Sequence, residues 1–327
     1  MNTSRSRTAA VSVAAVSLAA LLVSTQAAAQ NYPAKPIRVI VPYPPGGTSD
    51  ILTRLVGAKL TEAWGQQILA DNRTGAGGNI GAELMVRAAP DGYTLMLTDI
   101  GNLVTSTILY AKLPFDLLRD FAPVVTVSYS PHLLAVHPSV PVKTVKELVA
   151  LAKSKPGKLN YAAGLGGTPH LAGLMFAQRT GINWVYIPTK GGAATSYAVA
   201  TGDADVLFLG ILQTLTHISS GKLKLIASSS AQRLSNLPDT PTVAESLPGF
   251  VTGSWQGILA PARTPPDVIA KLNNEVARVL KLNDVREVLT SQGTTPLATG
   301  PQDTGRWLTE EKERWTKVVK ESGFKLE

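Results

Sequence analysis

The fold is decided first by the stretch IRVIVPYPPGGTSD, residues 37–50. Residues 37–41 are almost entirely apolar and β-branched, which predicts a buried strand. A proline- and glycine-rich loop follows, and Thr48, Ser49 or Asp50 can cap the helix that we expect over residues 51–60. Backbone N–H groups at a helix N-terminus bind anions when no side chain covers them. A purely structural turn would have the same composition, so both interpretations stay open.

No Gly-Lys-Ser/Thr sequence follows this loop, so it is not a P-loop. An anion bound here would be a carboxylate or phosphate held mainly by backbone groups. The candidate ligand contacts in this loop are Tyr43, Pro45, Gly46, Gly47, Thr48 and Asp50.

The first third of the chain alternates strands and helices. After residues 37–60, we expect strands over 67–70 and 93–98 and a helix over 80–89. This β-α-β-α-β order predicts a parallel sheet with right-handed crossovers, whose ligands bind beyond the carboxyl ends of the strands. Thr98 and Asp99 lie at such an end and are further candidates. The loop 74–78 does not fit a dinucleotide fingerprint, so we interpret it as structural, with Asn79 capping the next helix.

The middle third repeats the pattern. We expect extended segments over 124–127, 133–136, 159–162, 184–187, 205–209 and 223–228, and a helix over 144–154 capped by Thr144. Glycine-rich loops again follow two of these strands. Asp205 enters an apolar strand, so it could face a cleft or only cap a turn. The candidate ligand contacts of this unit are Gly164, Gly166, Gly167, Thr168, Lys190, Gly191, Gly192 and Asp205.

The last third predicts a strand over 255–260 and three helices. The first helix runs from Pro265 to about residue 280 with Thr264 as its cap, and the second covers 284–291. The third covers 301–322, with Leu308, Trp315 and Val318 on a packing face and i,i+4 pairs between Glu310 and Arg314 and between Glu313 and Lys317.

Composition limits the classes of function. Residues 1–29 have basic residues, an apolar run and an Ala-x-Ala site, which predicts a cleaved signal peptide and a soluble, monomeric periplasmic protein. Cysteine is absent, so disulfides, lipid-modified thiols and thiolate chemistry are excluded. The net charge is +8 over the whole chain, with its basic residues scattered, which does not indicate nucleic-acid binding. Histidine spacing indicates no metal, no nucleophile has a base partner, and no cofactor is expected, so the sequence does not predict an enzyme.

Many short motifs together resemble the Bug family, the extracytoplasmic solute-binding receptors of tripartite tricarboxylate transporters. The resemblance covers essentially the whole chain after the signal. The matching stretches are 32–33, 42–50 with Arg54, 71–73, 75–81, 89–94, 113–116, 120–121, 158–161, 167–168, 190–191, 237–239 and 259–261.

This resemblance implies a two-lobed α/β fold, a type II-like Venus flytrap with a mixed, mainly parallel sheet in each lobe. One lobe would comprise residues 30–127 and 253–327, and the other residues 128–252. The loops 43–50 and 164–168 would together hold one carboxylate of the ligand, with 190–192 as a third contact. The ligand would be a di- or tricarboxylate, an acidic amino acid or an aromatic acid, delivered to the membrane subunits of a transporter.

Two alternatives stay open: a receptor of the same fold that presents its ligand to a sensor kinase, and an exported enzyme acting on a small acid. The chain also departs from the family pattern. Ala163 and Gly164 stand where serines are usual, and Asn102 and Leu103 stand where a Ser/Thr-His pair is usual. Asp99 is an additional acidic residue at this place, so the far end of the pocket is expected to differ.

Overall fold

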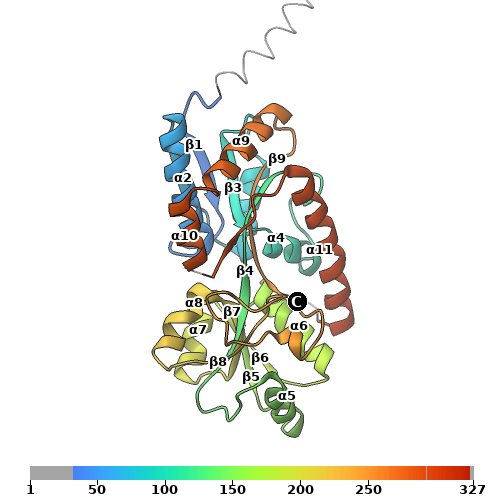
Figure 1. Ribbon diagram of the computed structural model, residues 1–327. Coiled ribbons are helices and arrows are strands. Elements are labelled where there is room, and N and C mark those ends of the chain that lie inside the picture. The colour runs from blue at the N-terminus through green and yellow to red at the C-terminus, as the bar shows by residue number, and fades with distance from the viewer. Residues whose placement is uncertain (1–31, 292, 325–327) are drawn as a thin grey trace, which may run out of the picture.

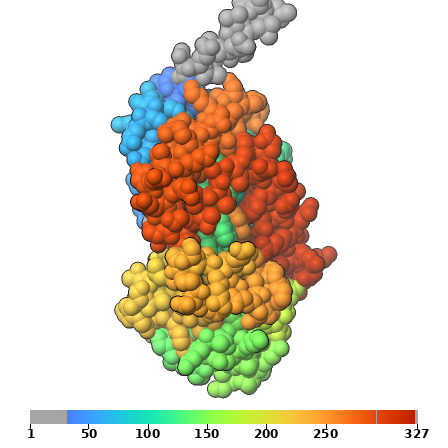
Figure 2. Space-filling model, in the orientation of Figure 1, coloured from blue at the N-terminus to red at the C-terminus, as the bar shows by residue number. Residues whose placement is uncertain are grey.

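A computed structural model describes residues 32–291 and 293–324. It has two α/β lobes, one above the other in Figure 1, joined along the middle by the long strand β4 (Phe121–Val136) and by β9 (Gly253–Pro261). The space-filling view in Figure 2 shows a waist between the lobes, where the green of the central segment is visible. The predicted fold class is therefore confirmed. The signal peptide predicted over residues 1–29 lies outside the described residues.

The upper lobe is built on a parallel core of three strands in the order β2-β1-β3, as the alternating sequence predicts. Strand β9 extends this core antiparallel to β3, and β4 pairs antiparallel with β9. The bounds are β1 (Ile37–Val41), β2 (Ile68–Asn72) and β3 (Thr94–Asp99). The helices of this lobe are α2 (Thr48–Trp64), α3 (Asn79–Val86), α4 (Ile100–Leu109), α9 (Pro266–Val279), α10 (Asn283–Ser291) and α11 (Pro301–Ser322), with η1 (Ala76–Gly78) before α3.

The lower lobe has the same plan. Its parallel core is β6-β5-β7, and β4 pairs antiparallel with both β7 and β8. The strands are β5 (Asn160–Gly164), β6 (Val185–Thr189), β7 (Val206–Gly210) and β8 (Lys224–Ser228). The short β10 (Thr295–Pro296) belongs to the upper sheet, where it pairs antiparallel with Ser128 and Tyr129 of β4. The helices are α5 (Val145–Ser154), α6 (Thr168–Thr180), α7 (Gly192–Thr201) and α8 (Ile211–Ser219), with η2 (Val243–Glu245) after β8.

Strand β4 is one continuous strand of 16 residues, where the sequence predicts two separate segments. Its partner changes from β9 to β7 between Pro131, which lies opposite Gly253, and His132, which lies opposite Gly210. Proline has no N–H to donate to a ladder, so it interrupts the sequence pattern of a strand and is tolerated where the pairing changes.

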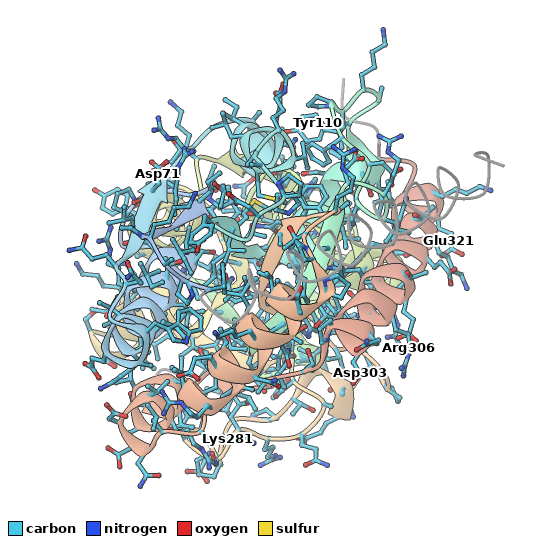
Figure 3. All side chains as sticks on the ribbon, turned by 90° about the horizontal axis from the view of Figure 1, so that it is seen from above. Asp71, Tyr110, Lys281, Asp303, Arg306 and Glu321 are labelled. Carbon is cyan, nitrogen blue, oxygen red and sulfur yellow. The ribbon has the colours of Figure 1, made fainter. Side chains whose placement is uncertain are left out.

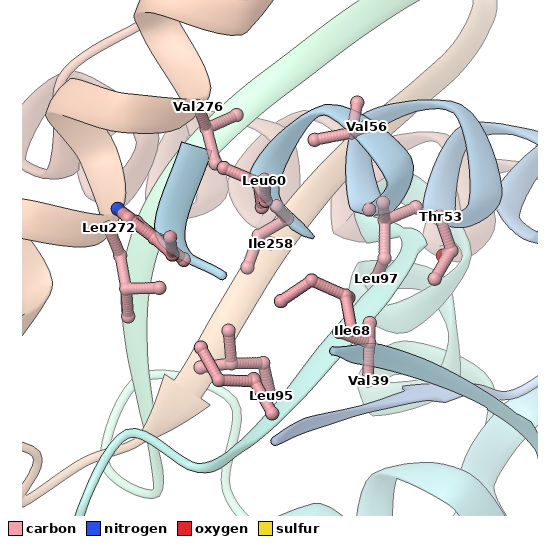
Figure 4. Close-up of a pocket in the computed structure, with 13 residues that line it drawn as sticks. Val39, Thr53, Val56, Leu60, Ile68, Leu95, Leu97, Ile258, Leu272 and Val276 are labelled. Carbon is pink, nitrogen blue, oxygen red and sulfur yellow. The ribbon is translucent and has the colours of Figure 1, made fainter. Parts of the chain in front are cut away.

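An apolar layer between α2, α9 and the upper sheet stabilises the lobe that carries the first loop. Val56 and Leu60 of α2 pack against Leu97 and Ile258 of the sheet and Leu272 of α9 (Figure 4). The gap between them measures about 20 Å³ and is lined almost entirely by aliphatic side chains. It is little larger than one water molecule needs, so we interpret it as a packing gap and not as a ligand site.

Helix α11 begins and ends where the sequence predicts, and its packing face is confirmed. Trp315 is fully buried and its indole N–H donates to Glu311 at 2.7 Å. The ion pairs differ from the predicted ones, because Arg314 pairs with Glu311 at 3.0 Å and Lys317 with Glu321 at 4.0 Å. Seen from above, the charged side chains Asp303, Arg306 and Glu321 lie along the outer side of this helix (Figure 3).

Three predicted caps are wrong. The N-cap of α2 is Gly47, and Thr48, Ser49 and Asp50 already lie inside the helix. Gly78 occupies the N-cap position before α3, and Asn79 is already the first helical residue. The N-cap of α9 is Pro265, while the Thr264 hydroxyl donates back to the Pro261 carbonyl at 2.7 Å. In all three places a glycine or proline of the preceding turn occupies the N-cap position, where the capping preference alone predicts a polar residue.

Candidate ligand-binding site between the lobes

Five helices begin where strands of the two lobes end. Helices α2 and α4 follow β1 and β3 of the upper lobe, and α6, α7 and α8 follow β5, β6 and β7 of the lower lobe. The N-cap residues of α2, α6, α7 and α8 are all glycine and have no side chain to cap the helix, although the first N–H of α6, that of Thr168, donates to Asn102. A helix start without a side-chain cap leaves N–H groups and partial positive charge available to an anion.

Contacts between the lobes join these helix starts on one side. The side-chain oxygen of Asn102, in the first turn of α4, accepts a hydrogen bond from the backbone N–H of Thr168 at 2.8 Å. The Asn102 amide nitrogen donates to the Tyr43 hydroxyl at 3.2 Å. The loops that begin α2 and α6, which the family resemblance assigns to one carboxylate, are thus brought together through Asn102.

Contacts on the other side bring in α7 and α8. The Gln213 amide of α8 donates to the Thr48 hydroxyl of α2 at 3.4 Å. A Cβ at Gly192 would lie 3.2 Å from Gln213 Cγ, and a Cβ at Gly164 would lie 3.6 Å from the Cα of Gly191. The contacts therefore run in a closed ring through α2, α4, α6, α7 and α8.

Asp50 organises the first loop. Its carboxylate accepts hydrogen bonds from Gly46 N–H at 3.0 Å, from the Asn72 amide at 3.2 Å and from the Arg54 guanidinium at 3.0–3.2 Å. Burial favours the neutral acid, but the hydrogen bonds from Arg54, Gly46 and Asn72 outweigh it and lower the pKa of Asp50. Asp50 is only 4% exposed, so it shapes the loop from behind while Pro45 and Gly46 lie exposed at its tip.

Tyr43 lies between this loop and α4. Burial raises the pKa of its hydroxyl, the negative charge of Asp99 raises it further, and hydrogen bonds with Thr98 and Asn102 act in the opposite direction. A Cβ at Gly78 would lie 3.4 Å from the Tyr43 ring, so the loop before α3 must approach this side chain closely. Tyr43 is neutral in this setting and can donate or accept hydrogen bonds.

A chain of hydrogen bonds crosses the floor of the site. The Ser49 hydroxyl donates to Gln256 at 2.6 Å, the Gln256 amide donates to Ser254 at 2.8 Å, and the Ser254 hydroxyl donates to Asp99 at 2.7 Å. This chain connects the starts of α2 and α4 through β9. It holds the side chains at these two helix starts in one hydrogen-bonding arrangement.

Asp99 is the N-cap of α4 and is 6% exposed. Its carboxylate accepts from the backbone N–H groups of Gly101 at 3.0 Å and Asn102 at 3.4 Å. Burial raises its pKa to about 6, and the hydrogen bonds from Ser254 and from the backbone N–H groups only partly offset this.

The second loop is held from the lower lobe and from α4. Gly166 has a φ of +73°, its N–H donates to His170 Nδ1 at 3.3 Å, and its carbonyl accepts from the Thr105 hydroxyl of α4. Gly167 is extended, at φ −77°. Behind the loop, Thr168 is fully buried and its hydroxyl lies 3.5 Å from His132 Nε2. Burial lowers the pKa of His132 to about 3, so the imidazole is neutral.

The remaining predicted residues fall into two groups. Lys190 is exposed beside Gly191 at the start of α7, at the edge of the ring. Asp205 is different, because its carboxylate accepts from Asn160 N–H at 2.7 Å at the amino ends of β5 and β7. Parallel strands present their amino ends at the opposite edge of the sheet from the cleft. The prediction that Asp205 faces the ligand is therefore wrong.

Some residues of this site escape the sequence motifs. Gln213, Gln256 and Ser254 belong to the network but lie outside the glycine-rich stretches, and Asn102 stands out only as a departure from the family pattern. The sequence contains one local signal for Gln213, because Gly210 ends β7 just as Gly164 ends β5.

Within the described part of the chain, no three His, Asp or Glu side chains lie together as metal ligands would. No helix there is long and apolar enough to span a membrane.

Two α/β lobes connected by crossing strands, with helix starts converging between them, define a periplasmic-type solute-binding protein. The chain belongs to the family described as "Tripartite tricarboxylate transporter family receptor", whose model matches residues 52–324. It is 34% identical to the protein BugT of Bordetella pertussis over 319 residues, covering 97% of this chain and 98% of BugT.

Two solved structures of similar proteins carry ligands in their descriptions. R. palustris Rpa4515 with adipate has a TM-score of 0.84 and 34% identity, covering 89% of this chain and 98% of that protein. MatC of Rhodopseudomonas palustris with bound malate has a TM-score of 0.80 and 32% identity, covering 88% of this chain and 100% of that protein. The family consists of solute-binding receptors, as the sequence predicts.

Proposed function

We propose that this protein captures a small carboxylate-bearing solute in the periplasm and delivers it to the membrane subunits of a tripartite tricarboxylate transporter. The observation that carries this proposal is the convergence of four glycine-capped helix starts from both lobes. The ligand classes are those that the family resemblance implies: di- or tricarboxylates, acidic amino acids and aromatic acids.

The chemistry of the ring favours an anion of carboxylate size. Gly47 and Gly167 are extended and bring bare backbone to the starts of α2 and α6, where a side chain would fill the space. A hydrogen bond to a charged group contributes roughly 1.5–3 kcal/mol, so two or three such hydrogen bonds supply several kcal/mol of the free energy of binding. Similar proteins are described with adipate and malate, both of which are carboxylates.

Both lobes contribute to the ring, and this supports a role for lobe closure. Only a state with the lobes together offers the starts of α2 and α6 to one carboxylate, so the ligand should shift an open–closed equilibrium. We further propose that the lobes divide near residues 128 and 253, which is consistent with the change of partner of β4 after Pro131.

A thermal-shift screen tests the proposal. The mature protein is heated with a library of small acids, each beside its uncharged amide, because a ligand that binds only the native state raises the melting temperature by mass action. We expect a subset of acids to stabilise the protein and their amides to have no effect. Stabilisation by amides as strong as by acids would contradict a carboxylate site.

The two alternatives require different tests. Two adjacent genes for membrane subunits would support transport, whereas an adjacent sensor-kinase gene would support signalling by the same receptor. Incubating a stabilising acid with the protein and following it by mass spectrometry tests the enzyme alternative. We expect the acid to remain unchanged.

A further inference from the structure

We propose that His170 is a positioning residue of the second ligand loop, residues 164–168, and that Phe324, just after α11, holds its imidazole in place. The inference rests on the proposed function, because this loop is one of the two that would hold the ligand carboxylate. Neither side chain has to touch the ligand, since both act through the backbone of the loop.

His170 bonds back to the loop that precedes it. Its Nδ1 accepts the N–H of Gly166 at 3.3 Å. The carbonyl of Gly166 accepts from the hydroxyl of Thr105, which belongs to α4 of the upper lobe. His170 and Thr105 therefore hold the two peptide groups that flank Gly166, one from each lobe.

Tyr186 of β6 holds the base of the same loop. Its ring stacks on the imidazole of His170, with the centroids 4.1 Å apart and the planes inclined by 19°. Its hydroxyl donates to the carbonyl of Ala163 at 3.0 Å. The stacked pair thus tethers the loop just before it begins and again at Gly166, whose φ of +73° is one of many that a free glycine can adopt.

Phe324 fixes the ring of His170 from the end of α11. Helix α11 runs from the upper lobe to α6 of the lower lobe (Figure 1), where Glu321 accepts from the Gln178 amide at 2.7 Å. Phe324 packs edge-to-face on the imidazole, with a centroid distance of 4.6 Å and an angle of 85°. Packing against both Tyr186 and Phe324 keeps Nδ1 directed at Gly166.

The protonation of His170 suits an acceptor. The residue is 1% exposed, and burial lowers its pKa to about 4, so the imidazole is neutral. We assign the ring proton to Nε2, because Nδ1 accepts a hydrogen bond. Nε2 has no hydrogen-bond partner within the described part of the chain. A buried donor without a partner lowers folding stability, so stability alone does not account for a histidine at this position.

A purely structural role as an aromatic residue of the core is the competing explanation. His170→Phe separates the two explanations, because it keeps a ring for Tyr186 and Phe324 to pack on. It removes both the acceptor of the Gly166 N–H and the unpartnered Nε2. The free energy of unfolding should therefore stay the same or rise, while the loop loses its tether.

Two measurements on the mature protein test the proposal. Amide hydrogen exchange, followed by mass spectrometry, reports on residues 164–168. Calorimetry with succinate, citrate, glutamate and benzoate reports on binding. In His170→Phe we expect the loop to exchange faster by about threefold or more, and every acid that the wild type binds to bind roughly threefold to tenfold more weakly, as for the loss of one hydrogen bond.

His137→Phe is the matched control. His137 Nδ1 also accepts from a backbone N–H at 3.3 Å, that of Ser139. His137 lies at the opposite edge of the lower sheet, where its own N–H donates to the Asp205 carbonyl. This variant should leave the exchange of residues 164–168 and the affinities unchanged.

A double-mutant cycle tests the part of Phe324. Phe324→Ala alone should speed exchange of the loop and weaken binding, because the imidazole is then free to turn. If Phe324 acts through His170, the same substitution should have no further effect on either quantity in the His170→Phe background. Equal effects in both backgrounds would overturn the role of Phe324.

Each remaining outcome decides between the explanations. Exchange and affinity that are unchanged in His170→Phe would make His170 a core aromatic and leave the carboxylate receptor intact. A loss of affinity that is accompanied by a loss of folding stability would also overturn the positioning role. Failure of all four acids to bind the wild type would overturn the carboxylate site itself, and this inference with it.

Discussion

Asn102 and Thr168 lie in opposite lobes, and the Asn102 side-chain oxygen accepts a hydrogen bond from the Thr168 backbone N–H at 2.8 Å. The same Asn102 amide donates to Tyr43, so one side chain contacts both loops proposed to hold the carboxylate. This contact connects lobe closure to the shape of the site, because the lobes cannot separate without breaking it.

Replacing Asn102 by alanine removes both bonds and should favour the open state. At about 0.5–1.5 kcal/mol for each hydrogen bond, we expect ligand affinity to fall between roughly fivefold and a hundredfold. The radius of gyration of the ligand-free protein should rise, which small-angle scattering measures. Asn273→Ala is a matched control, since the Asn273 amide bonds Val124 and Thr299 within one lobe. If both variants scatter alike, Asn102 does not control closure.

Asp50→Ala should weaken binding without unfolding the protein. The variant loses the acceptor that positions Gly46, Asn72 and Arg54, so the loop loses its shape, and folding stability should fall by about 1–3 kcal/mol. We expect at least a tenfold loss of affinity by calorimetry. Asp120→Ala, which removes a carboxylate that holds Asp116 N–H and Arg119, is the control and should leave affinity unchanged. Unchanged affinity in Asp50→Ala would remove this loop from the site.

Gly47→Val tests whether the start of α2 must be bare. Gly47 has φ −76° and ψ 166°, which any residue adopts, and an added Cβ meets only the Pro44 carbonyl at 3.3 Å. The fold should therefore tolerate valine, while the side chain occupies space that a carboxylate needs, so binding should become undetectable. Gly300 is an N-cap glycine of the same conformation at α11, and Gly300→Val should bind normally. Equal affinities for the two variants would show that the start of α2 is not in contact with ligand.

The pH dependence of stability should reveal Asp99. Its pKa is about 6 in the folded protein against 3.8 for the free side chain, so between these values the folded state holds more protons than the unfolded state. The contribution of Asp99 is fully present below pH 3.8 and is lost as the pH rises through 6, with a total change of roughly 3 kcal/mol.

Chemical denaturation of wild type and Asp99→Asn over pH 4 to 7 measures this contribution. The free energy of unfolding of the wild type should fall relative to that of the variant as the pH rises. Since Asp50 and other paired carboxylates titrate equally in both proteins, the difference isolates Asp99. A difference that is constant with pH would mean that the Asp99 carboxylate ionises normally.

Local patterns predicted much of this fold, because they depend on neighbouring residues. The strand Ile37–Val41, the Thr144 cap and the helix Pro301–Ser322 are confirmed. The loops 43–50 and 164–168 could be selected because bare backbone at a helix start is visible in the sequence.

Long-range pairs could not be predicted in this way. Asn102 contacts Thr168 66 positions later, and Gln213 contacts Thr48 across 165 positions. The sequence shows an acidic residue beside a strand but does not show which end of the strand faces the cleft, so it does not distinguish a ligand contact from a turn at Asp205, which lies at the other edge of the sheet.

The most direct test of a carboxylate held between two lobes compares the acid that stabilises the protein most with its methyl ester, which has the same carbon skeleton and no charge. Small-angle scattering is recorded on the mature protein alone, with saturating acid and with the ester at the same concentration. We predict that the acid reduces the radius of gyration and that the ester leaves it unchanged. Equal compaction by acid and ester would contradict the account, because the carboxylate would then not be what brings the lobes together.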